Sequence, residues 1–200
     1  NIEYCETNDK TLLNGCVSFN ELKGRILNVR NYNITATDSL KFKVASQFMN
    51  AATLKVNYAQ SYLDTLASFT ITVHISPFDL TKLNPLLGPT VSAKVNSGYL
   101  DTISMIAIGR RHVSLGEMKM YYRDLNIELL DKGSEDHKSL KTRVVTLLAD
   151  AVVKNNNSSG TGEVYAERVY EKGFPNYWLR ILLSGVMTNT GIRTNKKQEK

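Results

Sequence analysis

The stretch YLDTLASFTITVHI, which spans Tyr62–Ile75, decides the fold class of this chain. After Ala67 its apolar and polar side chains alternate strictly, the apolar ones being Phe69, Ile71, Val73 and Ile75 and the polar ones Ser68, Thr70, Thr72 and His74. Because successive side chains of a strand point to opposite faces of a sheet, this pattern predicts a strand with one buried face and one wet face.

Neighbouring stretches carry the same signal. Residues 40–48 and 52–58 alternate in the same way, and the connections between these stretches are short. Short connections and one-sided burial favour antiparallel pairing, since parallel strands need long crossovers. The tetrapeptide YLDT at Tyr62–Thr65 returns at Tyr99–Thr102, where it opens a second apolar run. This echo suggests a sheet built by repetition.

Two features interrupt the strand pattern. Ser76, Pro77 and Asp79 are typical of a helix start, so we expect a short helical insert at about 77–87, divided by Pro85 and closed by Gly88 and Pro89. Within His112–Leu130 the apolar parity slips twice, and each slip predicts a β-bulge, one near Gly116 and one near Arg123–Asp124.

Helical spacing of apolar residues returns near the C-terminus, where it predicts one helix at about 136–154 and a second at about 174–188. The second is too short to span a bilayer. We expect Trp178, which lies in it, to face the core rather than a membrane. The predicted fold class is therefore mainly β (α+β). A long curved antiparallel sheet, the short insert and the two helices form a single domain over residues 1–192, followed by a polar tail at 193–200.

Charge and cysteine content narrow the function classes. The net charge is +6, but the tail from Arg193 to Lys200 holds four basic residues and one acid, so half of the excess lies there. The remaining body is only mildly basic, which argues against a nucleic-acid surface. Cys5 and Cys16 flank a turn-like segment and are compatible with either a disulfide across a hairpin or two small buried thiols.

Motifs that carry catalysis are not recognisable. His74, His112 and His137 lie on three separate expected elements, and none has a metal-ligand spacing to a Cys or an acid. Asp64 and Asp101, which the YLDT echo copies, are read as turn residues rather than as a catalytic carboxylate pair. We therefore expect no enzyme activity, no catalytic residues, no metal and no cofactor.

Several segments resemble the C-terminal part of AsmA-like proteins of Gram-negative envelopes, a group that includes relatives of TamB. The segments are Gly15–Val29 (GCVSFNELKGRILNV), His74–Thr102 (HISPFDLTKLNPLLGPTVSAKVNSGYLDT), Gly116–Leu130 (GEMKMYYRDLNIELL) and Lys172–Val186 (KGFPNYWLRILLSGV). The resemblance implies a β-groove on the periplasmic side of the envelope. It also implies that the chain is the C-terminal fragment of a longer protein, anchored in the inner membrane by a helix outside this chain.

The resemblance further implies a non-enzymatic role in outer-membrane biogenesis or envelope integrity, with lipid handling or lipid transport through the groove. The expected partners are phospholipid or another lipid, envelope proteins, or preceding β repeats of the same chain. The candidate lipid contacts are the apolar positions of three expected strands: Phe42, Val44, Leu54, Val56, Phe69, Ile71, Val73 and Ile75. Two alternatives stay open: the helices cover this face as an ordinary core, or the chain is a structural or protein-interaction module that uses exposed sheet edges without lipid.

Overall fold

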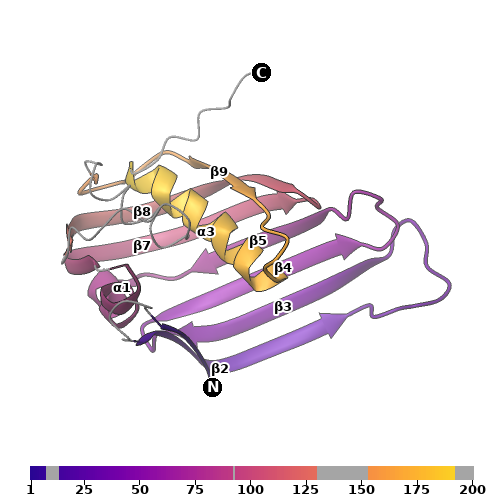
Figure 1. Ribbon diagram of the computed structural model, residues 1–200, viewed down its shortest axis with the longest axis horizontal. Coiled ribbons are helices and arrows are strands. Elements are labelled where there is room, and N and C mark those ends of the chain that lie inside the picture. Colours follow the sequence, from indigo (N-terminus) through magenta and orange to yellow (C-terminus); the bar gives the residue numbers. More distant parts are fainter. Residues whose placement is uncertain (8–13, 92, 130–152, 192–200) are drawn as a thin grey trace.

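Antiparallel strands follow one another across an open, curved sheet in a computed structural model that describes residues 1–7, 14–91, 93–129 and 153–191 (Figure 1). Within these residues the sheet has nine strands, eight of them in the order β1-β2-β3-β4-β5-β7-β8-β9 and a short one, β6, paired with β7. The strands are β1 (Ile2–Thr7), β2 (Asn14–Leu27), β3 (Ser39–Phe48), β4 (Ala52–Ser61), β5 (Phe69–Ile75), β6 (Phe78–Asp79), β7 (Ala93–Gly109), β8 (Val113–Leu129) and β9 (Gly162–Glu167). The helical elements are η1 (Leu80–Leu83), α1 (Asn84–Val91) and α3 (Phe174–Thr190). The predicted long antiparallel sheet is confirmed.

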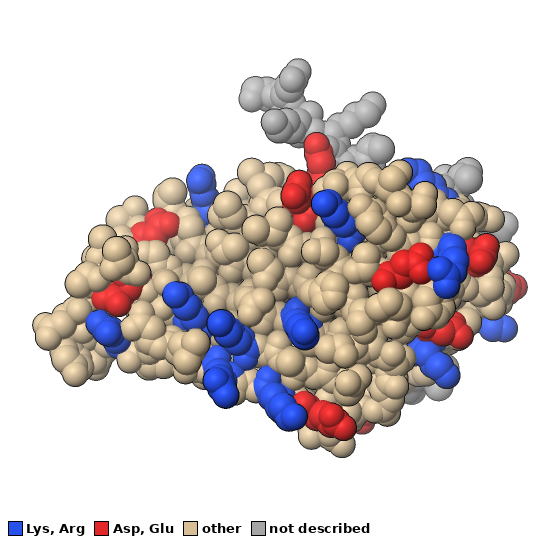
Figure 2. Space-filling view, turned by 180° about the vertical axis from the view of Figure 1, so that it is seen from behind, with Lys and Arg blue, Asp and Glu red and all other residues tan. Residues whose placement is uncertain are grey.

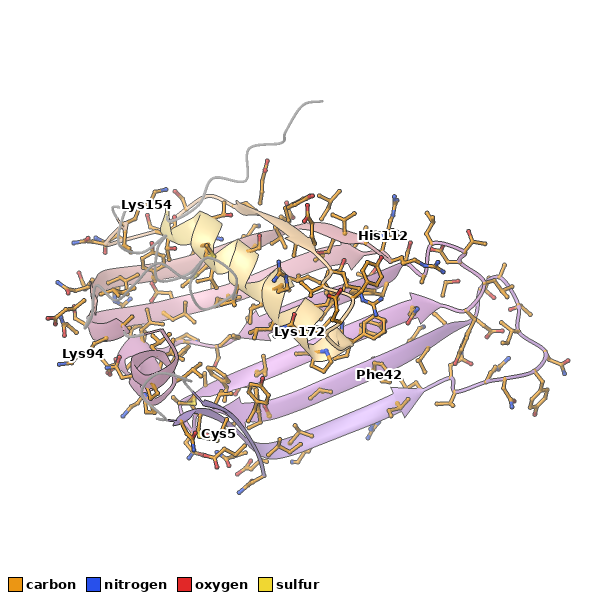
Figure 3. All side chains as sticks on the ribbon, viewed as in Figure 1. Cys5, Phe42, Lys94, His112, Lys154 and Lys172 are labelled. Carbon is orange, nitrogen blue, oxygen red and sulfur yellow. A yellow bond between two sulfur atoms is a disulfide. The ribbon has the colours of Figure 1, made fainter. Side chains whose placement is uncertain are left out.

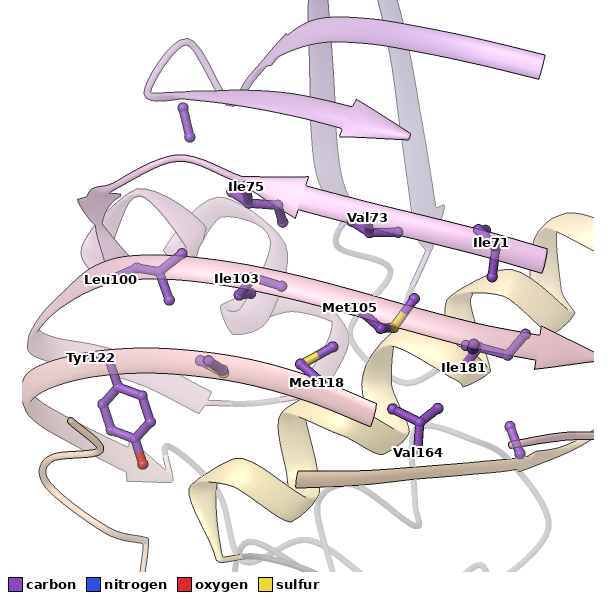
Figure 4. Close-up of a cluster of buried hydrophobic side chains, with 14 of the residues drawn as sticks. Ile71, Val73, Ile75, Leu100, Ile103, Met105, Met118, Tyr122, Val164 and Ile181 are labelled. Atoms are coloured by element: carbon purple, nitrogen blue, oxygen red, sulfur yellow. The ribbon is translucent and has the colours of Figure 1, made fainter. Parts of the chain in front are cut away.

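The alternation in β5 defines the two faces of the sheet. Phe69, Ile71, Val73 and Ile75 are all buried on what we call the inner face, which carries α3, and Thr70, Thr72 and His74 lie on the outer face. Cross-strand partners extend this inner face into β7 and β8 through Ile103, Met105 and Met118 (Figure 4). Burying this continuous apolar layer is the main driving force for the fold.

Helix α3 confirms the helix expected at 174–188. It crosses the inner face diagonally and lies mainly against β8 and β9 (Figure 1). The helix begins after Gly173, has Pro175 in its first turn and ends at Gly191, whose left-handed φ of 81° is the usual glycine stop. Gly185 permits the close approach, because a Cβ there would lie 2.7 Å from the Met118 Cε.

The helical insert differs from the prediction at both ends. Ser76 is not a helix cap, since its hydroxyl accepts a hydrogen bond from the Thr53 backbone N–H at 2.8 Å. Asp79 instead caps η1 by accepting from Thr81 N–H at 2.9 Å. Helix α1 then runs through Gly88 and Pro89 to Val91. Asn84 anchors it by exchanging two hydrogen bonds, of 2.9 and 2.7 Å, with the backbone of Val95 in β7.

Of the two predicted bulges, one is confirmed and one is wrong. The β7–β8 register shifts where β8 passes from Asn126 to Arg123, and Asp124 has a φ of 54°. Gly116, in contrast, pairs without a shift with Ala107 on one side and Val164 on the other. The parity changes there because the inner positions of β8 are the small residues Ser114 and Gly116, while the apolar Leu115 lies on the outer face.

The YLDT echo does not mark equivalent structure, so its interpretation as a repeat is wrong. Asp64 lies in a turn, where its carboxylate accepts a hydrogen bond from Leu66 N–H at 2.8 Å, as expected for a turn residue. Asp101 lies within β7 and forms an ion pair with Arg123 at 2.7 Å. The helix expected at 136–154 falls in a segment outside the described residues, apart from its last two positions, which are not helical.

Candidate functional site

The inner face has one buried part and one part that is only partly covered. The β5 members of the candidate lipid-contact set, Phe69, Ile71, Val73 and Ile75, are 2–7% exposed. Phe42, Leu54 and Val56, on β3 and β4, are partly buried and pack against the core. Val44, also on β3, is partly buried. Contact between a ligand and the β5 positions would require the packing above them to open.

A row of apolar side chains continues from these β3 and β4 positions to the lower rim of the sheet in Figure 1. In β2, Ile26 lies opposite Phe42 and is 63% exposed, and Gly24 lies opposite Val44, which itself faces Val56. We call the set Ile26, Phe42, Val44, Leu54 and Val56 the open strip. Figure 3 places Phe42 on β3, beyond the N-terminal end of α3. Ile26 was not among the sequence candidates, because the irregular β2 pattern hid which of its side chains face inward.

Aromatic rings separate the open strip from the covered core. Tyr58 stacks between Phe42 and Phe69, with ring centroids 5.2 and 5.1 Å away, and Trp178 of α3 lies 5.6 Å from the Tyr58 ring. Burial raises the pKa of Tyr58 to about 12. Trp178 therefore packs on the sheet, in agreement with the expectation that it faces the core. Its indole N–H is buried without a hydrogen-bond partner among the described residues.

The two edges of the sheet differ in whether their backbone groups have partners. At β9 the backbone N–H of Tyr165 donates to the Ser184 hydroxyl of α3 at 3.0 Å, and Arg180 Nε donates to the Glu167 carbonyl at 3.0 Å. Side chains of α3 thus satisfy backbone groups of this edge strand. At the opposite edge β1 pairs with β2 only from Asn14 to Phe19, which leaves the rest of β2 without a described partner strand on that side.

The disulfide lies beside this second edge. Cys5 and Cys16 are directly opposed on β1 and β2 and are bonded, which decides between the two alternatives left by the sequence. Glu3 lies near both sulfur atoms, but a disulfide offers no thiolate ligand to a metal ion. Within the described chain this is the one group with metal-ligand spacing, and its chemistry does not suit a metal.

Cations gather on the outer face of the β2–β5 half, and Figure 2 shows Lys and Arg clustered on this side of the molecule. The exposed cations are Lys23, Arg25, Lys41, Lys43 and Lys55. A depression of about 320 Å³ lies beside them, and Lys55, His74, Glu117 and Lys119 are among the residues that line it. Among the described residues, no hydrogen-bond partner is found for the side chain of His74 or of Glu117.

The remaining chemical candidates are not brought together. His112 hydrogen-bonds to the hydroxyl of Tyr170 near the start of β8, and His137 lies outside the described residues. Asp64 and Asp101 lie in different settings, as described above. No described helix is both long enough and apolar enough to cross a membrane.

Comparison of the chain with models of protein families, with curated proteins and with solved structures finds no match.

Proposed function

We propose that this chain is a non-enzymatic protein of the bacterial cell envelope, on the periplasmic side, that serves outer-membrane biogenesis or envelope integrity by holding a lipid acyl chain on the open strip. The observation that carries the proposal is the run of apolar side chains from Val56 to the 63% exposed Ile26, which continues the core but is not fully covered by the described residues. The likeness of four segments to AsmA-like proteins supports the envelope assignment.

An acyl chain suits this strip in length and chemistry. It spans half of a bilayer core, about 15 Å. The open strip runs from Leu54, opposite Ser46, to Ile26, opposite Phe42, which is about 13 Å along β3 and about 10 Å across two strand spacings. Each methylene removed from water contributes about 0.8 kcal/mol, so partial burial against Phe42 and Val44 suffices for binding. The partly buried ring of Trp178, which packs on the buried Tyr58 ring, forms one apolar wall of the strip.

The test is binding of a fluorescent phospholipid to the purified protein. Val44→Asp places a charge in the middle of the open strip and is expected to weaken binding at least tenfold, because the carboxylate would have to lose its water. Thr72→Asp, on the outer face, is the matched control and is expected to leave binding unchanged. A well-folded protein that retains no lipid, or two variants that lose it equally, would contradict the proposal.

A second function is favoured by the exposed edge of β2, namely that of a structural or protein-interaction module that accepts a partner strand without binding lipid. Strand addition would form backbone hydrogen bonds along this edge. Amide hydrogen exchange tests it: a partner strand is expected to slow exchange over residues 22–27. Unchanged exchange in the presence of every partner tried would leave the edge without a role.

A further inference from the structure

The free part of the β2 edge is long enough to accept a strand. Asn1 Oδ1 accepts a hydrogen bond from Glu21 N–H at 3.3 Å, and beyond that point no described strand pairs with the side of β2 that faces away from β3. We call residues 22–27 the open edge. Its six residues span about 20 Å and leave a row of backbone donors and acceptors accessible.

Proteins usually block such edges with proline, a bulge, charge or a covering element. The open edge contains no proline, and its register with β3 is regular from Lys23 to Leu27. A β-bulge between Asn20 and Lys23, where Glu21 has a φ of 49°, interrupts only the start of this edge. From Lys23 onward, positive charge is the protection that remains, in Lys23 and Arg25 on the outer face. Charge is a selective form of protection, because it repels cationic strands and attracts anionic ones.

The neighbouring strands strengthen this positive charge. Lys43 lies directly opposite Arg25, and Lys41 is two residues further along β3. Like charges in directly opposed positions destabilise a sheet. The sequences of β3, β4 and β5 contain no Asp or Glu, and no ion pair among the described residues involves these four cations. The one acid of β2 is Glu21, which precedes the open edge, so these strands carry a net positive charge beside the open edge.

In the register centred on Gly24, this charge disfavours a second copy of the chain as the partner. An antiparallel pair of two open edges centred on Gly24 would place Lys23 opposite Arg25 twice, next to the lysines of both β3 strands. The pairing would then set like charges against each other at every outer position beside the centre.

We infer that the open edge accepts a strand from another protein in which apolar and acidic residues alternate, an inference that rests on the second proposed function. Carboxylates would lie opposite Lys23 and Arg25 on the outer face. A large apolar side chain would cover Gly24, which has no side chain of its own and where even an added Cβ would meet Val44 Cγ2 at an ordinary contact distance of 3.8 Å. A further apolar side chain would lie against Ile26. The added strand would thus continue the apolar inner face and the charged outer face of the sheet.

A palindromic peptide tests the inference in either strand direction. The probe is a fluorescein-labelled peptide of sequence TVEFEVT, and the control peptide, TVKFKVT, replaces both acids by lysine. Fluorescence anisotropy with the full chain, in the absence of lipid, is expected to show binding of the acidic peptide at least tenfold tighter than that of the basic one. This expectation follows because two opposite-charge cross-strand pairs contribute up to about 1 kcal/mol each. Failure of the acidic peptide to bind overturns the inference.

Charge reversal locates the site. Lys23→Glu combined with Arg25→Glu is expected to weaken binding of the acidic peptide at least tenfold and to reverse the preference toward the basic peptide. The matched control, Lys55→Glu combined with Lys119→Glu, makes the same charge change on the same face but away from the edge, and is expected to reduce binding less than threefold. Equal losses in the two variants would show attraction by the whole face and would overturn the inference.

Amide exchange over residues 22–27 distinguishes failure of this inference from failure of the second proposed function, strand addition, on which it rests. Slower exchange with the acidic peptide alone supports both. Slower exchange with both peptides alike leaves strand addition standing and overturns the preference for acids. Binding of the acidic peptide without slower exchange overturns the edge as the site of contact.

Discussion

The two edges of the sheet show two ways to end a β-structure. At β9 a helix lies alongside, and Ser184 and Arg180 occupy backbone groups that a further strand would otherwise use. At β2 no described strand pairs with the outer side of residues 22–27, and the protection is electrostatic. The difference teaches that the β9 edge is protected by side chains of a helix that occupy its backbone groups, whereas the β2 edge keeps its backbone groups and is protected mainly by charge.

The largest expected effect is on the helix that closes the β9 edge. Ile181 is completely buried in α3, so Ile181→Ala is expected to lower the free energy of unfolding by about 3 kcal/mol through lost contacts and the cavity left behind. Ile26→Ala, at the open edge, removes a side chain that is 63% exposed and is expected to cost less than about 0.5 kcal/mol. Urea denaturation measures both. Similar losses would mean that the two edges are equally packed.

The next largest expected effect is a loss of stability at alkaline pH, which arises from buried tyrosines in the covered part of the sheet. Burial raises the pKa values of Tyr58 and Tyr122 to about 12, above the ordinary value of about 10. The unfolded chain therefore releases these protons first. The contribution of these two tyrosines to the free energy of unfolding is fully present below a pH of about 10. It falls by about 2–3 kcal/mol per tyrosine as the pH rises to about 12.

Denaturation midpoints measured from pH 8 to 12 check this expectation. Tyr58→Phe is expected to remove the Tyr58 share of the alkaline loss and to leave the rest to Tyr122 and Tyr177, because burial raises the pKa of both. Tyr32→Phe is the control, since Tyr32 is 74% exposed. If Tyr58→Phe loses as much stability at alkaline pH as the unchanged protein does, the raised pKa of Tyr58 is not a cause of this loss.

A smaller effect is expected from the hydrogen bond between α3 and β9. Ser184→Ala leaves the Tyr165 N–H without the hydroxyl acceptor, at an expected cost of about 1 kcal/mol, and exchange of that amide is expected to become faster. Asn57→Ala is the control, because it removes an exposed bond to Thr72 on the outer face and leaves β9 alone. If exchange at Tyr165 stays slow in Ser184→Ala, the helix does not protect this edge through that bond.

The smallest expected effect has the opposite sign. Lys43→Gln relieves the repulsion with Arg25 across the strands and is expected to raise stability by a few tenths of a kcal/mol at low salt. Lys94→Gln is the matched comparison, because Lys94 lies opposite Glu128 and its loss is expected to lower stability by a similar amount. Raising the salt concentration is expected to shrink both effects. A destabilising Lys43→Gln would show that the charge beside the open edge is already compensated.

Local sequence determined the strands and their faces. The alternation of Phe69, Ile71 and Val73 with threonines predicts β5 and its buried side, because the side-chain period of a strand is a property of the backbone. The same holds for β3, β4 and most of α3, whose apolar spacing and terminal glycine are local signals. The same alternation predicts that the β3 and β4 members of the candidate lipid-contact set face the apolar side of the sheet.

Only the tertiary structure decided which edge was closed, and which apolar residues remained accessible. Ser114 lies at a buried inner position that its polarity does not predict, since its hydroxyl is satisfied by the Ala166 carbonyl across the strands at 3.2 Å. Identical YLDT tetrapeptides became a turn and a strand, because their partners differ. Alternation reports that a side chain faces inward, but burial and edge pairing depend on residues distant in the chain, such as Ser184 beside Tyr165, which no local pattern can bring together.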